Sequence, residues 1–266
     1  MKKNFRSLAV IIATVALSIG CKKDATVAVS SDEISQEILS QVKNLGFGTS
    51  SLQKVEGGYL VEGDILLTPE HLRSKPVTQF LRIGAEEQYR TSNTVLGLPR
   101  TITIRVSTAM PSTYITAVNA AIARYNALGL LIKFSRVTSG GDIVINPAPS
   151  NATYLASGGF PLDNGKPYNQ ILVNRTALNA WAANTKTTVM AHEIGHCIGM
   201  RHSDYYNRSL SCGGSYVNEG ASTIGAKLIP GTPSYAEAGS WMLACINNGG
   251  NRPFTYADKV ALNFLY

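Results

Sequence analysis

The order of predicted elements in residues 99–266 indicates an α+β domain. Residues 100–107 alternate between apolar and polar side chains, as a half-buried strand does. Residues 111–128 have apolar side chains at helical spacing and end before a glycine. Two short apolar runs, at 130–137 and 141–145, predict further strands. A strand, a helix and two more strands therefore begin one domain that combines a sheet with helices.

The later elements follow from the same patterns. Residues 148–166 are rich in Gly, Pro, Ser and Asn and predict a long surface loop, which leads to a short strand at 169–174. A short helical or turn segment is expected at 177–183. A longer helix should then begin at a cap formed by Asn184 or Thr185 and run to Ile198. A final helix is expected in residues 254–266.

Residues 1–20 predict a signal peptide. A basic start precedes a twelve-residue apolar run at 8–19. A helix of that length spans about 18 Å, whereas a bilayer core is about 30 Å thick. Residues 17–21 (L-S-I-G-C) resemble the lipobox of bacterial lipoproteins, although the expected aliphatic residue, Leu17, lies one place early. This resemblance implies cleavage before Cys21 and lipidation of Cys21, and an ordinary secretory signal peptide is the alternative. In either case we expect the chain in the bacterial cell envelope, as an outer-membrane lipoprotein, or at the cell surface or secreted.

Residues 21–98 predict a pro-segment, followed by a catalytic domain at 99–266, with an N-terminal accessory module as the alternative. Residues 31–33 should cap a short helix, which ends at 45–48. Residues 59–67 predict two short strands broken at Gly63. Residues 86–96 are polar and irregular, as in an exposed linker that a protease can cut.

Residues 191–204, A-H-E-I-G-H-C-I-G-M-R-H-S-D, contain three of the four histidines of the chain. His192 and His196 lie about one helical turn apart, so both imidazoles point from the same helix face. With His202 they can bind one zinc ion and leave a coordination position open. Glu193 is placed to act as a general base and acid. Gly199 can adopt a left-handed conformation that turns the chain and brings His202 to the metal.

The spacing H-E-x-x-H-x-x-G-x-x-H resembles the signature of metzincin zinc proteases. The motif sequence H-E-I-G-H-C-I-G-M-R-H, together with the segments 211–214, 218–220 and 229–233, resembles the sequences of bacterial HEIGH metallopeptidases. These proteins have a matrixin- or astacin-like catalytic domain. This resemblance implies a twisted, mostly parallel sheet with an edge strand over the active-site helix, and the G-D-I-V-I segment at 141–145 is similar to one near that edge. It also implies a zinc-dependent endopeptidase that uses zinc-activated water, with Met242 in a turn beneath the metal.

Two further features bear on this comparison. The sequence V-E-G-D-I at 61–65 resembles the F-x-G-D latency motif of astacin pro-segments, with Val61 where those have an aromatic residue. The resemblance implies that Asp64 binds the zinc in the precursor, and a simple Gly-Asp turn is the alternative. Astacins and serralysins have a tyrosine where this chain has Ala244. Tyr205 and Tyr206 are the candidates to replace it, or else form aromatic walls.

If Cys21 carries lipid, three cysteines remain. Cys197 falls on an apolar stripe of the predicted zinc-binding helix and is expected to be a small buried thiol. In an oxidising compartment we expect a Cys212–Cys245 disulfide, and a Cys197–Cys212 bridge is the competing pairing.

The composition excludes several other classes. The net charge of +7 is partly due to the leader, and the other Lys and Arg residues are scattered, so we expect no nucleic-acid partner. We expect a monomer that acts on proteins or peptides and touches the membrane only through its lipid. A surface adhesin with a structural zinc is a second hypothesis, and a zinc amidase for cell-wall peptides is a third.

Overall fold

A computed structural model describes residues 34–74, 88–220, 226–233 and 236–266, which belong to one compact unit that begins at Ile34. The predicted signal peptide, the lipidation site Cys21 and the helix cap at 31–33 lie outside the described residues. No helix among those described is both long and apolar enough to cross a membrane.

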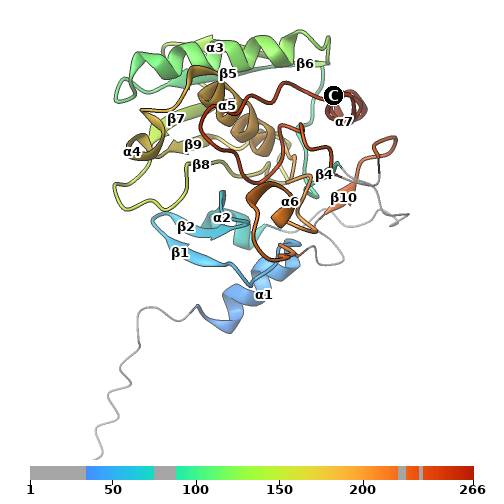
Figure 1. Ribbon diagram of the computed structural model, residues 1–266. Coiled ribbons are helices and arrows are strands. Elements are labelled where there is room, and N and C mark those ends of the chain that lie inside the picture. Colours follow the sequence, from blue (N-terminus) through green and yellow to red (C-terminus); the bar gives the residue numbers. More distant parts are fainter. Residues whose placement is uncertain (1–33, 75–87, 221–225, 234–235) are drawn as a thin grey trace, which may run out of the picture. The chain divides into compact units, whose positions relative to one another are not determined.

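A five-stranded, mostly parallel sheet forms the centre of the fold, as predicted (Figure 1). Its strands are β5 (Arg100–Val106), β6 (Ile132–Val137), β7 (Ile143–Pro147), β8 (Ala156–Ser157) and β9 (Gln170–Val173), and their order in space is β6-β5-β7-β9-β8. Only β8 runs antiparallel to its neighbour. The edge strand near the site is therefore β8, which lies in the region predicted as a loop, whereas the G-D-I-V-I segment leads into the inner strand β7.

Two helices of fifteen residues pack together against this sheet, α3 (Ser112–Asn126) and α5 (Ala183–Cys197). The hydroxyl of Tyr125 on α3 donates a hydrogen bond of 2.8 Å to the carbonyl of Ala191 on α5. Helix α5 is buried along almost its whole length, and Cys197 is fully buried on its apolar back as predicted. Its cap is Ala182 rather than Asn184 or Thr185, and the Ala182 amide donates to Asn248.

The shorter elements of the C-terminal part are α4 (Arg175–Leu178), α6 (Ser209–Cys212), β10 (Lys227–Leu228) and α7 (Tyr256–Leu265). The final helix α7 begins at a capping box, in which Thr255 and Asp258 each accept a hydrogen bond from the other's backbone amide.

Residues 34–74 form a small unit of secondary structure within the fold. It contains α1 (Gln36–Asn44), α2 (Pro69–Arg73) and an antiparallel sheet of β1 (Gln53–Val55), β2 (Gly58–Val61) and β3 (Ile65–Leu67). The two strands predicted at 59–67 are present, and they are separated at Gly63. Helix α1 is capped by Ser35, whose hydroxyl accepts from the Ile38 amide.

These elements share a separate apolar core, to which the rest of the chain contributes Phe160; the other members are Val42, Leu45, Phe47, Val61, Ile65, Leu67 and Leu72. The segment thus buries its own apolar side chains largely among themselves.

The prediction of an exposed linker at 86–96 is wrong for residues 88–95, which are buried or half-buried. Strand β4 (Tyr89–Arg90) pairs with β10, and the Gln88 side chain donates to the Asp258 carboxylate over 2.8 Å. The segment looked like a linker because its side chains are polar, but those side chains have buried partners. The domain boundary at residues 98 and 99 stays a prediction.

Candidate metal centre and active site

Helix α5 and the turn that follows it bring the three histidines together. The helix carries His192 and His196 and ends at Cys197, after which Gly199 has a φ of +108°. The Met200 amide reaches back to the Gly195 carbonyl over 2.9 Å, which closes the helix end. A Cβ on Gly199 would lie 2.8 Å from the Asn93 carbonyl. This tight turn therefore requires glycine for two reasons, the positive φ and the lack of room for a side chain.

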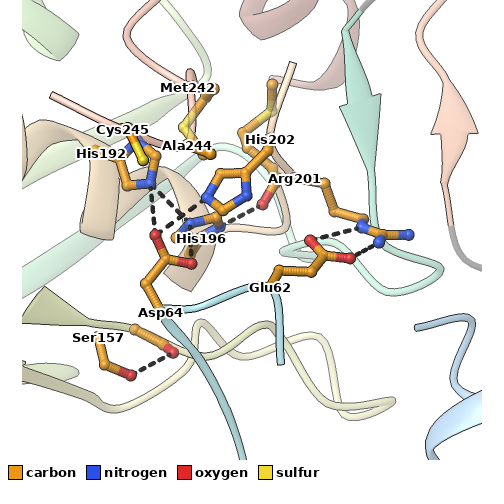
Figure 2. Close-up of polar contacts among 12 residues, drawn as sticks. Glu62, Asp64, Ser157, His192, His196, Arg201, His202, Met242, Ala244 and Cys245 are labelled. Atoms are coloured by element: carbon orange, nitrogen blue, oxygen red, sulfur yellow. Dashed lines mark hydrogen bonds and ion pairs between the residues drawn. The ribbon is translucent and has the colours of Figure 1, made fainter. Parts of the chain in front are cut away.

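The three imidazoles meet around the carboxylate of Asp64 (Figure 2). The Nε2 atoms of His192 and His196 lie 2.9 Å apart. From Asp64, Oδ2 lies 3.1 Å from Nε2 of His202 and 3.5 Å from Nε2 of His192, and Oδ1 lies 3.7 Å from Nε2 of His196. The sequence-predicted ligands and Asp64 therefore form one group, with one ligand atom from each within 4.8 Å of the others.

The opposite ring nitrogens fix the orientation of the histidines. Nδ1 of His192 donates to the Trp241 carbonyl over 2.8 Å, and Nδ1 of His196 donates to the Met200 carbonyl over 2.9 Å. Nδ1 of His202 donates to the Glu219 carboxylate over 3.0 Å. With the proton on Nδ1, each Nε2 keeps a free lone pair for a metal.

The donor set fits zinc. Three imidazole nitrogens with one carboxylate oxygen is a set that zinc accepts, and every member is buried or half-buried. Oδ1 of Asp64 and Oε2 of Glu193 are buried and have no hydrogen-bond partner among the described residues. Orphaned anionic oxygens in such a place are costly unless a cation or a proton compensates them.

Glu193 points its carboxylate toward the edge of the sheet. It is buried, and burial, followed by the nearby charge of Asp64, raises its pKa well above the usual value. The backbone of Gly158, directly after β8, lies close to this carboxylate and lowers its pKa, against the larger effect of burial. A Cβ on Gly158 would lie 3.2 Å from Oε2 of Glu193, so a glycine lets the edge of the sheet approach the helix closely.

Met242 packs against helix α5 at Gly195, and its place beneath the metal stays a prediction. Its side chain is fully buried, and its carbonyl accepts from the Ser203 amide over 2.9 Å. A Cβ on Gly195 would lie 2.7 Å from the Met242 sulfur and 3.2 Å from Nε1 of Trp241. The glycine of the H-E-I-G-H sequence therefore makes room for the methionine turn.

The two tyrosines proposed to replace the missing one at Ala244 face other groups. Tyr205 packs edge-on against Tyr89 with ring centroids 4.4 Å apart, and the hydroxyl of Tyr206 accepts from the Ala236 amide. Tyr154, which sequence reasoning missed, instead lines the same cavity as Glu193. Burial, and then the charge of Glu193, raise the pKa of its phenol.

The sulfur atoms of Cys212 and Cys245 are bonded in the structure, which is the pairing that the sequence favoured. Cys197 is a free, buried thiol, and burial raises its pKa. The disulfide joins α6 to the chain just after Met242, next to the metal centre.

Residues 34–74 contribute more than Asp64 to the surroundings of the site. The Leu66 amide donates to the Gly158 carbonyl over 2.8 Å, so β3 contacts the central sheet through one isolated bridge at the end of β8. Glu62 forms an ion pair with Arg201, which stands between Met200 and His202 (Figure 2). Both side chains are buried, at 1% and 0% exposure.

The chain is similar to one known protein family and to solved structures. Residues 59–266 match the model of a family described as dual-action HEIGH metallo-peptidases. Two solved structures, titled "Structure of Myroilysin" and "Crystal structure of myroilysin", are similar at 15% identity. Their TM-scores are 0.42 and 0.39; the matches cover 65% and 62% of this chain and 82% of each of theirs. At this level they say nothing of the chain's activity. No curated protein matches the sequence.

Proposed function

Because the chain belongs to the HEIGH metallopeptidase family and is a zinc metallopeptidase, we propose that it is an endopeptidase whose general base and acid is Glu193. The observation that carries this proposal is the position of Glu193. Its buried carboxylate has an unpaired oxygen and lines one cavity together with His192 and Asp64. A proton acceptor is thus held next to the metal ligands, in a place that a substrate can reach.

His192, His196 and His202 would hold the zinc, which when bound polarises a peptide carbonyl and lowers the pKa of water. Glu193 takes a proton from the attacking water and delivers it to the leaving amine. The Trp241 carbonyl, the Met200 carbonyl and Glu219 keep the three rings in their orientation during the reaction.

The edge of the sheet at β8 would bind the substrate backbone. Its Gly158 carbonyl accepts a hydrogen bond from Leu66, and an extended peptide can make the same bond once residues 34–74 leave. Because Gly158 also touches Glu193, a peptide paired with this edge passes next to the catalytic carboxylate. An extended peptide of several residues suits an endopeptidase.

We further propose that residues 34–74 keep the precursor inactive. Asp64 lies within 3.7 Å of all three Nε2 atoms and so takes the position where zinc would need an exchangeable ligand. Strand β3 occupies the sheet edge at the same time. One segment therefore blocks both the metal and the backbone-binding strand.

Two arginines hold this segment in place. Arg201 pairs with Glu62, donates to the carbonyl of Gly46 over 3.1 Å, and lies 4.7 Å from the ring centre of Phe47. Arg208 donates to the Glu62 carbonyl over 2.6 Å. The carboxylate of Glu62 thus binds beside the metal site, two residues before Asp64, and fixes where Asp64 can reach.

The site of action that we propose is outside the cytoplasm. The signal-like residues 1–20 and Cys21 support export and a lipid tether at the cell surface, and the Cys212–Cys245 disulfide agrees with an oxidising compartment. Lipidation can be checked by mass spectrometry of the mature N-terminus, where an unmodified Cys21 would argue for plain secretion.

The proposed catalytic role is tested with Glu193→Ala. We expect the variant to bind one zinc per chain, by metal analysis, and to lose at least 10³-fold in cleavage of casein or gelatin, because the proton acceptor is gone. Chelation should abolish wild-type cleavage and added zinc should restore it. Full activity in Glu193→Ala would refute the mechanism. A wild-type protein that binds zinc but cleaves no protein would favour a binding role, and cleavage of muropeptides alone would favour an amidase.

A further inference from the structure

A cavity of about 320 Å³ lies next to the candidate active site. His192 and Glu193 line one side of it, and residues 243–247 line another. Asp64 also borders it, so the cavity begins where the precursor segment blocks the histidines. A side chain of a bound peptide, close to the bond being cut, can enter this space.

Arg252 also lines the cavity, and its backbone position is fixed. Its amide donates to the Thr188 hydroxyl on α5 over 3.0 Å, and its carbonyl accepts from Arg124 over 3.1 Å. The side chain is half-buried, and no hydrogen bond or ion pair of its guanidinium is found within the described part of the chain. Burial lowers the pKa of Arg252, and the charge of Asp204 opposes that shift.

The neighbouring charges are already engaged. Asp204 uses one carboxylate oxygen for the Ala244 amide and the other for the Ser211 hydroxyl. The second guanidinium of the cavity, that of Arg208, donates to Glu219, and this bond does not depend on the precursor segment, whereas its bond to the Glu62 carbonyl does. Arg252 is therefore the basic group of this cavity that is left for a ligand.

We propose that this cavity binds an acidic side chain of the substrate, and that Arg252 selects it. The inference rests on the proposed peptidase function and names the class of substrate. A carboxylate that enters the cavity would gain a charge-assisted hydrogen bond from a half-buried guanidinium that makes no hydrogen bond or ion pair within the described residues. Of the two carboxylates that line the cavity, Asp64 would depart with the precursor segment and Glu193 would remain.

The test uses zinc-loaded full chain, activated by limited proteolysis that releases residues 34–74, and pairs of fluorogenic peptides. The two peptides of a pair differ at a single position, where one has Glu and the other has Gln. This position is the residue directly before or the residue directly after the scissile bond. For one of these positions we expect a kcat/KM at least tenfold higher with Glu. This preference should disappear in Arg252→Gln and persist in part in Arg252→Lys.

The matched control is Arg136→Gln, because Arg136 lies on β6 at the opposite edge of the sheet and should leave the Glu-to-Gln ratio unchanged. Wild-type cleavage without a preference for Glu at any position, or a preference that survives in Arg252→Gln, would overturn the inference and leave the peptidase function intact. Failure of the wild type to cleave any peptide would overturn both. Melting temperatures of the variants show whether a lost preference reflects misfolding.

Discussion

The ion pair between Glu62 and Arg201 allows the docking of the precursor segment to be measured. Both side chains are essentially excluded from solvent. Glu62→Gln would leave the buried Arg201 guanidinium without the carboxylate that it pairs with, and only the charge of Glu219 would still act on it. Breaking one side of a buried pair costs about 3–5 kcal/mol, and the amide oxygen of Gln still accepts a hydrogen bond, so we expect about 3 kcal/mol. This corresponds to a docking equilibrium about 10²-fold weaker.

The Leu66 amide reports this equilibrium directly. It bonds to the Gly158 carbonyl of the catalytic part, so its hydrogen exchange depends on docking. In a Glu193→Ala background, which prevents self-cleavage, Glu62→Gln should speed exchange at Leu66 about 10²-fold.

Glu56→Gln serves as the control for this experiment, because Glu56 is exposed in the turn between β1 and β2. Its exchange at Leu66 should match that of the parent. If Glu62→Gln leaves the Leu66 amide as protected as in the parent, Arg201 does not hold the segment and the reasoning fails.

Two more substitutions test the neighbourhood of the metal. Gly195→Ala should stabilise the fold by about 1 kcal/mol through helix propensity and destabilise it by about 1–3 kcal/mol through crowding of Met242. We therefore expect a lower melting temperature, and a higher one would show that the methionine moves aside freely. Glu219→Gln removes the charge that His202 and Arg208 share, and zinc affinity measured by chelator competition should fall about 10- to 100-fold; unchanged affinity would mean that His202 needs no carboxylate.

The histidine ligands could be predicted because their geometry is local. His192 and His196 are fixed by one turn of helix, and Gly199 is the single residue that lets His202 turn back within six positions. The alternating pattern of β5 and the apolar face of α3 follow equally from near neighbours in the sequence. Such features depend on periodicity, which a sequence displays.

The residues that escaped prediction act across long sequence distances. Glu219 contacts His202 from a stretch of sequence with no regular pattern. Gln88 lies in a polar segment that resembles a linker, and only the tertiary structure shows that it binds Asp258, 170 residues away. Strand β8 has two residues and pairs with one neighbour, so it leaves no periodic signal. Polar pairing and edge strands are set by the tertiary fold, and composition does not encode them.

The separate apolar core of residues 34–74 has a consequence for how the block is lifted. The segment contacts the rest of the chain through polar groups, which include Asp64, Glu62, the Leu66 amide, the Gly46 carbonyl and His71. Its apolar side chains face one another and Phe160. Because most of this core belongs to the segment itself, the segment could leave folded once the connecting chain is cut, and its departure would expose Phe160. Dissociation of the cut segment on dilution after export, rather than its unfolding, would then limit the rate of activation. At high concentration the cut segment would stay bound and the enzyme would stay inhibited.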